Sequence, residues 1–258
     1  MAFKRVSATV FIQNDQVVKS YAYSKFYPFG NLHTTLCILD RWLVDEIVIL
    51  DISRQRSISR YVLDQISSTS ISTPLIYGGG ISSIEHVDQL ISLGCDRIIL
   101  EDALFSNHNL IHQAANKYGS QAIIGSLPFS YSPKSPTSLI FPDYLHNQYP
   151  NLSVQQLLDN CQSLPISELL ISDFLHEGYS GNFDLKIAKF IFEKSNFLKG
   201  VLFFGGISAH IANTLLDYGN TAAILLGNPN YENELLIPTF KSLLLNNFLI
   251  RPSSSFPH

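Results

Sequence analysis

The chain repeats itself about half a chain apart. LIYGGGISS at Leu75–Ser83 and VLFFGGISA at Val201–Ala209 share an apolar run, adjacent glycines and an Ile-Ser pair. The likeness extends downstream, where IEHVDQLISLGCDRIIL corresponds to HIANTLLDYGNTAAILL, and upstream, where DEIVILDIS at Asp45–Ser53 resembles SELLISDF at Ser167–Phe174. A repeat of this length predicts duplicated structural units that pack against one another.

Short apolar runs alternate with amphipathic helical patterns along the chain. Most of these runs are unbroken, which is typical of parallel strands covered on both faces. We expect strands over Ser7–Gln13, Glu46–Asp51, Leu75–Tyr77, Arg97–Leu100, Ala122–Ser126, Glu168–Ser172, Gly200–Phe204 and Ala222–Leu226. We expect helices over Leu32–Trp42, Ile58–Ser67, Ile84–Gly94, Asn107–Tyr118, Val154–Cys161, Leu185–Ser195, His210–Tyr218 and Tyr231–Asn246.

The duplication and the alternation together predict one closed barrel. Each half would leave open strand edges if it stood alone, and joining the two halves removes those edges. We therefore predict an α/β fold, a single (β/α)8 TIM barrel over residues 1–250, with half-barrels at about 1–121 and 122–250. Residues 251–258 are predicted to form a flexible tail.

Composition narrows the class of protein. Hydrophobic residues make up 46% of the 258, which excludes global disorder, and a net charge of -4 gives no footprint for nucleic acid or an acidic membrane. No apolar run reaches membrane-spanning length, and the run near the start is too short for a signal peptide. Cys37, Cys95 and Cys161 lie outside any C-x-x-C pattern, so we expect reduced, buried thiols in a cytoplasmic protein without a metal or cofactor.

The repeated glycines follow strands and precede helices. Backbone N–H groups there can face an oxyanion, and two such turns on opposite sides of a barrel could hold the two ends of a bisphosphate. Tight turns that need positive φ are the alternative. The predicted phosphate-binding residues are Gly79, Gly80, Gly178, Gly205, Gly206 and Gly227. Barrel active sites lie at the carboxyl ends of the strands, which places Asp51, Glu101, Pro128, Asp173 and Glu177 near one mouth.

Several motifs together resemble the cyclase subunit of imidazole glycerol phosphate synthase. They are KRVSATVFIQNDQVVKS, VDEIVILDIS, GGGI, CDRIIL, YGSQAIIG, SELLIS and FFGGIS, and the resemblance covers nearly the whole chain. It implies a barrel of histidine biosynthesis that receives ammonia from a glutaminase partner. The family uses that ammonia to cleave and cyclise a bisphosphorylated ribonucleotide, which is a lyase reaction.

The chain departs from this family at its catalytic positions. The two aspartates of the family fall on Phe11 and Pro128, and neither side chain can transfer a proton. Asp51, Glu101 and Glu177 are the acids that could substitute. Glu101, followed by Asp102, replaces an amide and a hydroxyl that meet one phosphate in the family, so this first pocket is expected to repel phosphate, although simple helix capping is the alternative.

The opposite end of the barrel keeps the family's pattern. The resemblance implies a ring of four charged residues around the entrance for ammonia, and the aligned residues are Arg5, Glu46, Arg97 and Glu168. Asp96 and Gln121 align with positions that meet the glutaminase. Paired charges inside a barrel could equally be a structural plug without a partner.

Three functions are open at this point. The first is an ammonia-conducting barrel that has lost or altered its cyclase chemistry and is partnered with a HisH-like glutaminase. As the resemblance to diverged relatives implies, this barrel would serve a nucleotide-sugar amidotransferase in amidino-sugar or surface-polysaccharide synthesis. The second is an active cyclase of histidine biosynthesis with displaced acids. The third is a non-catalytic binding or scaffold barrel. A phosphorylated small molecule is the ligand expected at the glycine turns, with at most one anion at the second pair.

Overall fold

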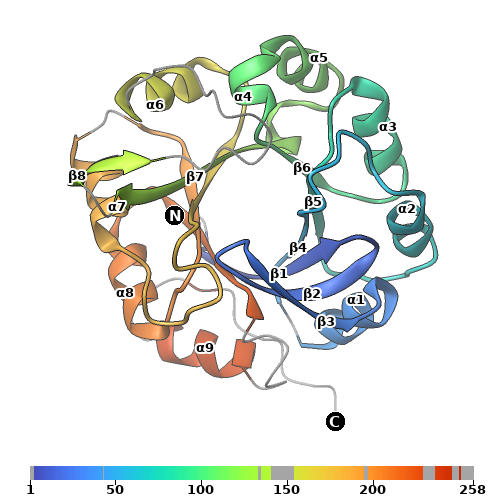
Figure 1. The fold of residues 1–258 in the computed structure, drawn as a ribbon, viewed down its shortest axis with the longest axis horizontal. Coiled ribbons are helices and arrows are strands. Elements are labelled where there is room, and N and C mark those ends of the chain that lie inside the picture. Colours follow the sequence, from blue (N-terminus) through green and yellow to red (C-terminus); the bar gives the residue numbers. More distant parts are fainter. Residues whose placement is uncertain are drawn as a thin grey trace.

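A closed parallel β-barrel forms the centre of the molecule (Figure 1). The computed structural model describes residues 3–42, 44–132, 135–140, 154–194, 197–228, 236–245 and 250. Within these ranges the eight parallel strands are β1 (Arg5–Gln13), β4 (Ile47–Asp51), β5 (Leu75–Gly78), β6 (Arg97–Leu100), β7 (Ile123–Ser132), β9 (Glu168–Asp173), β10 (Gly200–Phe204) and β11 (Thr221–Leu226). The barrel closes because β11 pairs with β1, in a register that places Arg5 beside Ala223. The predicted barrel fold is confirmed.

Helices surround the barrel on its outside (Figure 1). In the described part of the chain they are α1 (Leu32–Arg41), α2 (Arg60–Ser67), α3 (Ile84–Ser92), α4 (Ala103–Ser106), α5 (His108–Tyr118), α6 (Val154–Ser163), α7 (Leu185–Lys189), α8 (Ala209–Asp217) and α9 (Leu236–Leu245), with a 3₁₀ turn at Ser120–Ala122 and a π-helical turn at Phe190–Lys194. None of the described helices has the length and apolar character that crossing a membrane requires. The half-barrel boundaries remain predictions, and the tail at 251–258 lies outside the described residues.

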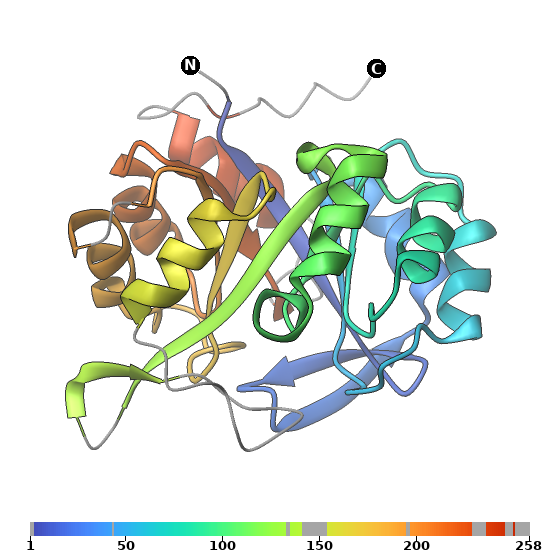
Figure 2. The same ribbon diagram turned by 90° about the horizontal axis from the view of Figure 1, so that it is seen from above.

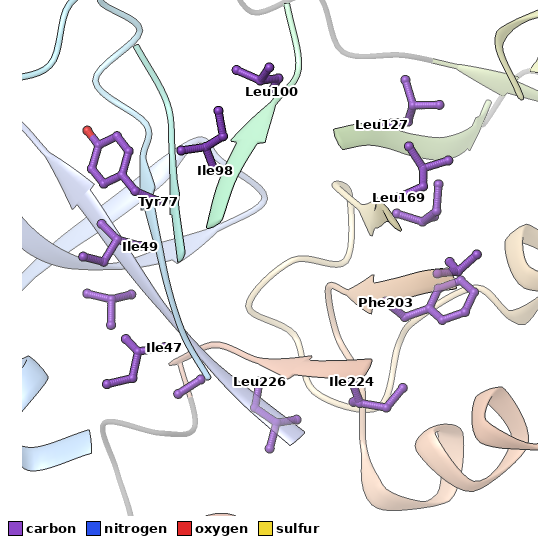
Figure 3. Close-up of a cluster of buried hydrophobic side chains, with 14 of the residues drawn as sticks. Ile47, Ile49, Tyr77, Ile98, Leu100, Leu127, Leu169, Phe203, Ile224 and Leu226 are labelled. Carbon is purple, nitrogen blue, oxygen red and sulfur yellow. The ribbon is translucent and has the colours of Figure 1, made fainter. Parts of the chain in front are cut away.

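Side-chain alternation along the strands creates two cores. Outward residues pack against the helices, and Figure 3 shows part of this layer, including Ile47, Ile49, Tyr77, Ile98 and Phe203. Inward residues fill the barrel itself with apolar side chains. The inward set is Phe11, Val18, Val48, Ile76, Ile99, Ile124, Leu170, Leu202, Phe204, Ala223 and Leu225. The strands are therefore covered on both faces, as their unbroken apolar runs predict.

An antiparallel hairpin extends from the first barrel strand. It consists of β2 (Gln16–Tyr21) and β3 (Lys25–Gly30), and β2 pairs with β1 so that Phe11 lies opposite Val18. Figure 2 shows this hairpin at the end of the barrel opposite the N-terminus. A further strand, β8 (Ser135–Ile140), pairs antiparallel with the extended end of β7. None of these three strands is in the predicted set.

The three cysteines are free thiols. Cys95 and Cys161 are buried as predicted, and burial raises the pKa of each to about 12. Cys37 is only partly buried. It lies on α1, and its sulfur is 3.9 Å from His33 Nε2. The prediction of a buried thiol is wrong for Cys37.

Candidate functional site

Aromatic rings occupy the centre of the barrel mouth, the end where the parallel strands finish. Phe11 is fully buried, and its ring centroid lies 5.6 Å from that of Phe204 and 5.7 Å from that of Tyr23. Pro128, on β7, lines a cavity beside this cluster. Neither Phe11 nor Pro128, the two positions that the sequence resemblance aligns with the family's acids, has a side chain that can exchange a proton.

A cavity of about 170 Å³ lies on the side of the mouth formed by the first half of the chain. Gly79 and Gly80 contribute one wall, and Tyr23 and Phe26 of the hairpin reach it from another side. Gly79 has a φ of +108°, and a Cβ there would lie 2.1 Å from the carbonyl oxygen of Asp51. This turn requires glycine for conformation alone, so the tight-turn interpretation accounts for Gly79 without an anion.

Glu101 and Asp102 both line this cavity but differ in surroundings. Glu101 is largely buried; Ser126 Oγ donates to its Oε2 at 3.1 Å, and burial raises its pKa to about 7. Asp102 is more exposed and lies 3.5 Å from the guanidinium of Arg56. The carboxyl groups predicted to repel phosphate are therefore both at the cavity.

The carboxylate of Asp51 accepts hydrogen bonds that stabilise the turn after β4. Its Oδ1 accepts from the backbone N–H of Ser53 at 2.9 Å, and its Oδ2 accepts from the hydroxyl of Tyr77 at 3.3 Å. Both oxygens thus have protein donors. As a substitute acid, Asp51 is less suited to proton transfer than Glu101.

The second glycine turn is covered by the hairpin. Gly178, Gly205, Gly206 and Gly227 surround a cavity of about 20 Å³, which is room for roughly one water molecule. The carbonyl oxygen of Ser20 would lie 2.4 Å from a Cβ on Gly178. An anion at this turn remains a prediction.

Glu177 fastens the hairpin over this turn. Its side chain is fully buried, its Oε2 accepts from Ser20 Oγ at 2.7 Å and from Tyr23 N at 3.3 Å, and its Oε1 has no hydrogen-bond partner among the described residues. Asn228 forms two further hydrogen bonds with the hairpin. Its Oδ1 accepts from the backbone N–H of Ser20, and its Nδ2 donates to the carbonyl oxygen of Ser20. Burial raises the pKa of Glu177 to about 7.

This raised pKa predicts a pH-dependent effect of Glu177→Gln. Between the usual value of 4.5 and about 7, the folded protein holds a proton that the unfolded chain has released, so the free energy of unfolding falls as pH rises through this window. Glutamine resembles the protonated acid and escapes that loss. We expect Glu177→Gln to gain about 3 kcal/mol at pH 8 but under about 1 kcal/mol at pH 5. Urea unfolding at the two pH values measures the difference.

The control for this prediction is the exposed Glu193→Gln on the π-helical turn, which is expected to change stability little at either pH. An equal gain from Glu177→Gln at both pH values would contradict the protonated state that we assign to Glu177.

One contact at the mouth was not predicted from the sequence. Asp173 is fully buried, and its Oδ2 accepts from His176 Nδ1 at 2.7 Å and from the backbone N–H of Asp184 at 2.9 Å. Asp173 therefore braces the loop between β9 and α7. The spacing of Asp173 and His176 is the signal from which this contact could have been found.

The four charged residues at the other end of the barrel form a closed ionic ring, defined here as Arg5, Glu46, Arg97 and Glu168. The guanidinium of Arg5 is 2.7 Å from Glu168 and 3.3 Å from Glu46, and that of Arg97 is 2.5 Å from Glu168 and 3.5 Å from Glu46. Each arginine thus contacts both glutamates. Burial raises the pKa of Glu46, against the opposing effect of the two arginines.

Residues around the ionic ring are exposed. Asp96 accepts from the backbone N–H of Leu75 at 2.8 Å, and the carbonyl of Gln121 accepts from Arg97 Nε at 3.1 Å. Both belong to the segments that begin β6 and precede β7, so they lie at the same end as the ring. Phe3 and Leu198, just before β1 and β10, are 58% and 73% exposed. This end of the barrel therefore combines a buried charged centre with polar and apolar surroundings.

The fold and the site define one class of protein, a (β/α)8 barrel with glycine turns at one end and an ionic ring at the other. Comparison with known protein families points to the same class. Residues 5–235 match the family model described as "Histidine biosynthesis protein", and the chain belongs to this family. It is 30% identical over 189 residues to the imidazole glycerol phosphate synthase subunit HisF of Staphylococcus saprophyticus, covering 72% of this chain and 74% of the relative. It is 25% identical over 246 residues to the subunit of that name from Staphylococcus aureus strain RF122, covering 95% and 97%.

Proposed function

We propose that this chain is the HisF-like barrel subunit of a glutamine amidotransferase. It accepts ammonia from a HisH-like glutaminase at the end that carries the ionic ring and passes it along the barrel without the family's own cyclisation chemistry. The observation that carries the proposal is the contrast between the two ends. The ionic ring is complete, whereas Phe11 and Pro128 replace the acids at the mouth.

The ionic ring supports a gate. Charges taken out of water are costly unless they are paired, and each of the four residues here has two partners of opposite charge. A ring built from side chains can open when a guanidinium rotates towards a docked partner. Arg97 is the candidate for this movement, because its bonds to Ser167 Oγ at 2.9 Å and to the carbonyl of Gln121 place its guanidinium at the rim.

The barrel interior supports transfer of a neutral molecule. Above the ionic ring, Ser7 and Thr9 contribute hydroxyl groups, while Val48, Ile76 and Leu202 contribute apolar side chains. Transferring an ion through such surroundings is strongly unfavourable, whereas a small neutral molecule with few hydrogen bonds loses much less. This lining therefore favours ammonia over ammonium.

The surface around the ionic ring supports a protein partner there. Protein interfaces combine an apolar, aromatic centre with a polar rim. Phe3 and Leu198 supply exposed apolar groups, and Asp96 and Gln121 supply exposed polar groups at that end. Ammonia that leaves the mouth then requires an acceptor, and we propose a separate nucleotide-sugar amidotransferase of amidino-sugar or polysaccharide synthesis, as in the diverged relatives that the sequence resembles.

A second candidate function is active cyclisation. It is favoured by Glu101 and Glu177, whose buried carboxyl groups have pKa values of about 7, near the value that suits a general acid or base. Against it, Glu177 is covered by the hairpin and already accepts two hydrogen bonds from it. A scaffold barrel without a glutaminase is the third candidate.

Co-expression with the HisH-like glutaminase tests the docking that the first two functions require. We expect a one-to-one heterodimer in analytical ultracentrifugation at micromolar concentration, and glutamine hydrolysis that rises in the complex. Arg97→Ala should disturb hydrolysis or docking, whereas the matched control Arg60→Ala, on the exposed face of α2, should not. Absence of a complex with a folded chain would contradict the proposal and favour the scaffold.

A further inference from the structure

The cavity of about 170 Å³ at the mouth, defined above, has a chemistry that the proposed function does not use. For scale, an engineered apolar cavity of about 150 Å³ binds benzene, so this volume suits a ligand of roughly ten non-hydrogen atoms. It is small for a bisphosphorylated ribonucleotide, because sites for larger ligands usually exceed about 300 Å³. The cavity therefore fits a small organic molecule.

The polar groups of the cavity are unevenly distributed. Its inner part is formed by inward-facing residues of the barrel, Leu50, Ile99 and Leu170, together with Ser126 and the carboxyl group of Glu101. The arginines of the cavity have acceptors in the protein: Arg54 donates to the carbonyl of Tyr23 at 3.3 Å, and Arg56 lies 3.5 Å from Asp102. A ligand that enters the inner part thus meets the carboxyl group of Glu101, while the guanidinium groups of Arg54 and Arg56 bond the carbonyl of Tyr23 and the carboxylate of Asp102.

Aromatic side chains complete the cavity. Tyr23 and Phe26 reach it from the hairpin. The face of an aromatic ring attracts cations, and this attraction grows when water is excluded. A carboxylate inside the cavity and aromatic rings at its wall favour the same kind of ligand, which is a cation.

We propose that this cavity binds a small planar organic cation with N–H donors, of the amidinium or guanidinium class, and that Glu101 accepts hydrogen bonds from it. Two parallel N–H groups match the two oxygens of a carboxylate, and such charge-assisted pairs are about twice as strong as neutral ones. A phosphate would face Glu101, Asp102 and Asp51 in the same cavity. The assignment deepens the proposed function by naming the class of ligand at the exit of the barrel, and it does not depend on the glutaminase.

Three probes of one shape test the charge preference. Benzamidinium, benzamide and benzoate differ in charge while keeping nine non-hydrogen atoms, and isothermal titration calorimetry of the purified chain at pH 8 compares them. We expect benzamidinium to bind about tenfold more tightly than benzamide, and benzoate and inorganic phosphate not to bind. Tighter binding of benzoate or phosphate, or no binding of benzamidinium at 10 mM, would overturn the proposal.

Two variants test the contact with Glu101. Glu101→Gln keeps the shape and the acceptor for Ser126, so we expect benzamidinium to bind at least tenfold more weakly while benzamide changes by less than about twofold. Asp102→Asn, at the more exposed carboxyl, should weaken benzamidinium by less than about threefold. Circular dichroism melting shows whether each variant is folded. Equal losses in the two variants would show general electrostatics and overturn the assignment to Glu101.

The pH dependence provides an independent readout. The pKa of Glu101 is about 7, so its carboxylate form rises from about a tenth at pH 6 to about nine tenths at pH 8. Benzamidinium stays charged over this range, and we expect its binding to strengthen about tenfold. The other charged groups that line the cavity are Asp51, Arg54, Arg56 and Asp102. Binding that does not change between pH 6 and pH 8 would contradict the role of Glu101.

Failure of these binding tests leaves the heterodimer experiment unaffected, so the proposed ligand and the proposed function can fail separately.

Discussion

Glu168→Ala is expected to lower the free energy of unfolding by about 3–5 kcal/mol. Glu168 contacts both Arg5 and Arg97, at 2.7 Å and 2.5 Å, and all three side chains are largely shielded from water at the narrow end of the barrel. Its removal leaves two guanidinium groups with only Glu46 between them. Breaking a buried pair costs more than the pair contributes, because the remaining charge keeps its desolvation penalty.

Urea unfolding monitored by circular dichroism measures this effect. The matched control is Asp64→Ala, which removes a carboxylate from the exposed ion pair between Arg60 and Asp64 on α2 and should cost less than about 1 kcal/mol. Glu168→Gln keeps the shape and some of the hydrogen bonds, so we expect an intermediate loss and a chain that still folds. A cost below about 1 kcal/mol for Glu168→Ala would show that the ionic ring is not a coupled unit.

Lys241→Ala is expected to cost a similar amount, about 3–5 kcal/mol, through a different contact. Lys241 Nζ lies 2.7 Å from Asp45 Oδ1, and the two side chains are 2% and 3% exposed. The other oxygen of Asp45 accepts from the backbone N–H of Val6 at 2.7 Å. This ion pair therefore joins α9, the last helix described, to Asp45 in the segment before β4, and Asp45 in turn bonds β1.

A double substitution separates the loss of the Lys241 side chain from the cost of leaving Asp45 charged and unpaired. Lys241→Met keeps most of the side-chain volume but leaves Asp45 charged and unpaired, so it should be nearly as destabilising as Lys241→Ala. Adding Asp45→Asn removes the unpaired charge, and the double variant should recover at least half of the loss. Thermal unfolding of Lys241→Met, Asp45→Asn and the double variant provides the comparison. Additive losses in the double variant would contradict a direct interaction between the two charges.

The barrel could be predicted because its strands are buried on both faces. Runs such as EIVILD and ELLISD have unbroken aliphatic centres, IVIL and LLI, and the structure places strands β4 and β9 there. The duplicated glycines identified the turns after β5 and β10, where Gly79 and Gly205 have positive φ. The ring residues were selected through the resemblance; the structure joins the four of them by ion pairs, and their role as an ammonia gate stays a prediction.

The hairpin could not be predicted for a physical reason. Its second strand, β3, contains Pro28 and Gly30, residues that weaken a strand pattern, and most of its side chains are exposed. Proline is tolerated there because β3 pairs only with β2 along its described length and so forms a sheet edge. The hairpin also depends on long-range contacts, such as the bond between Ser20 and Glu177, which are 157 positions apart. Local sequence carries no sign of that contact.

The candidate site was predicted in its residues but not in its geometry. The glycine turns predicted two sites, of which the second was expected to suit an anion better, whereas the structure gives a cavity of about 170 Å³ at the first turn and one of about 20 Å³ at the second. The hairpin contacts both sides of the mouth: Tyr23 and Phe26 line the larger cavity, and Ser20 bonds Asn228 beside the smaller one. The packing of Phe11 against Phe204 likewise depends on side chains from β1 and β10, which single-sequence patterns do not relate.

Cyclisation by the purified chain tests the central claim most directly. The chain is incubated with the family's bisphosphorylated ribonucleotide and an ammonium salt, without glutaminase, and the products are followed by chromatography. We predict no imidazole glycerol phosphate above the rate without protein, because Phe11 and Pro128 stand where the family has its acids. Turnover proportional to protein concentration, and abolished by Glu101→Gln or Glu177→Gln in a folded chain, would contradict the claim that this barrel passes ammonia on without consuming it.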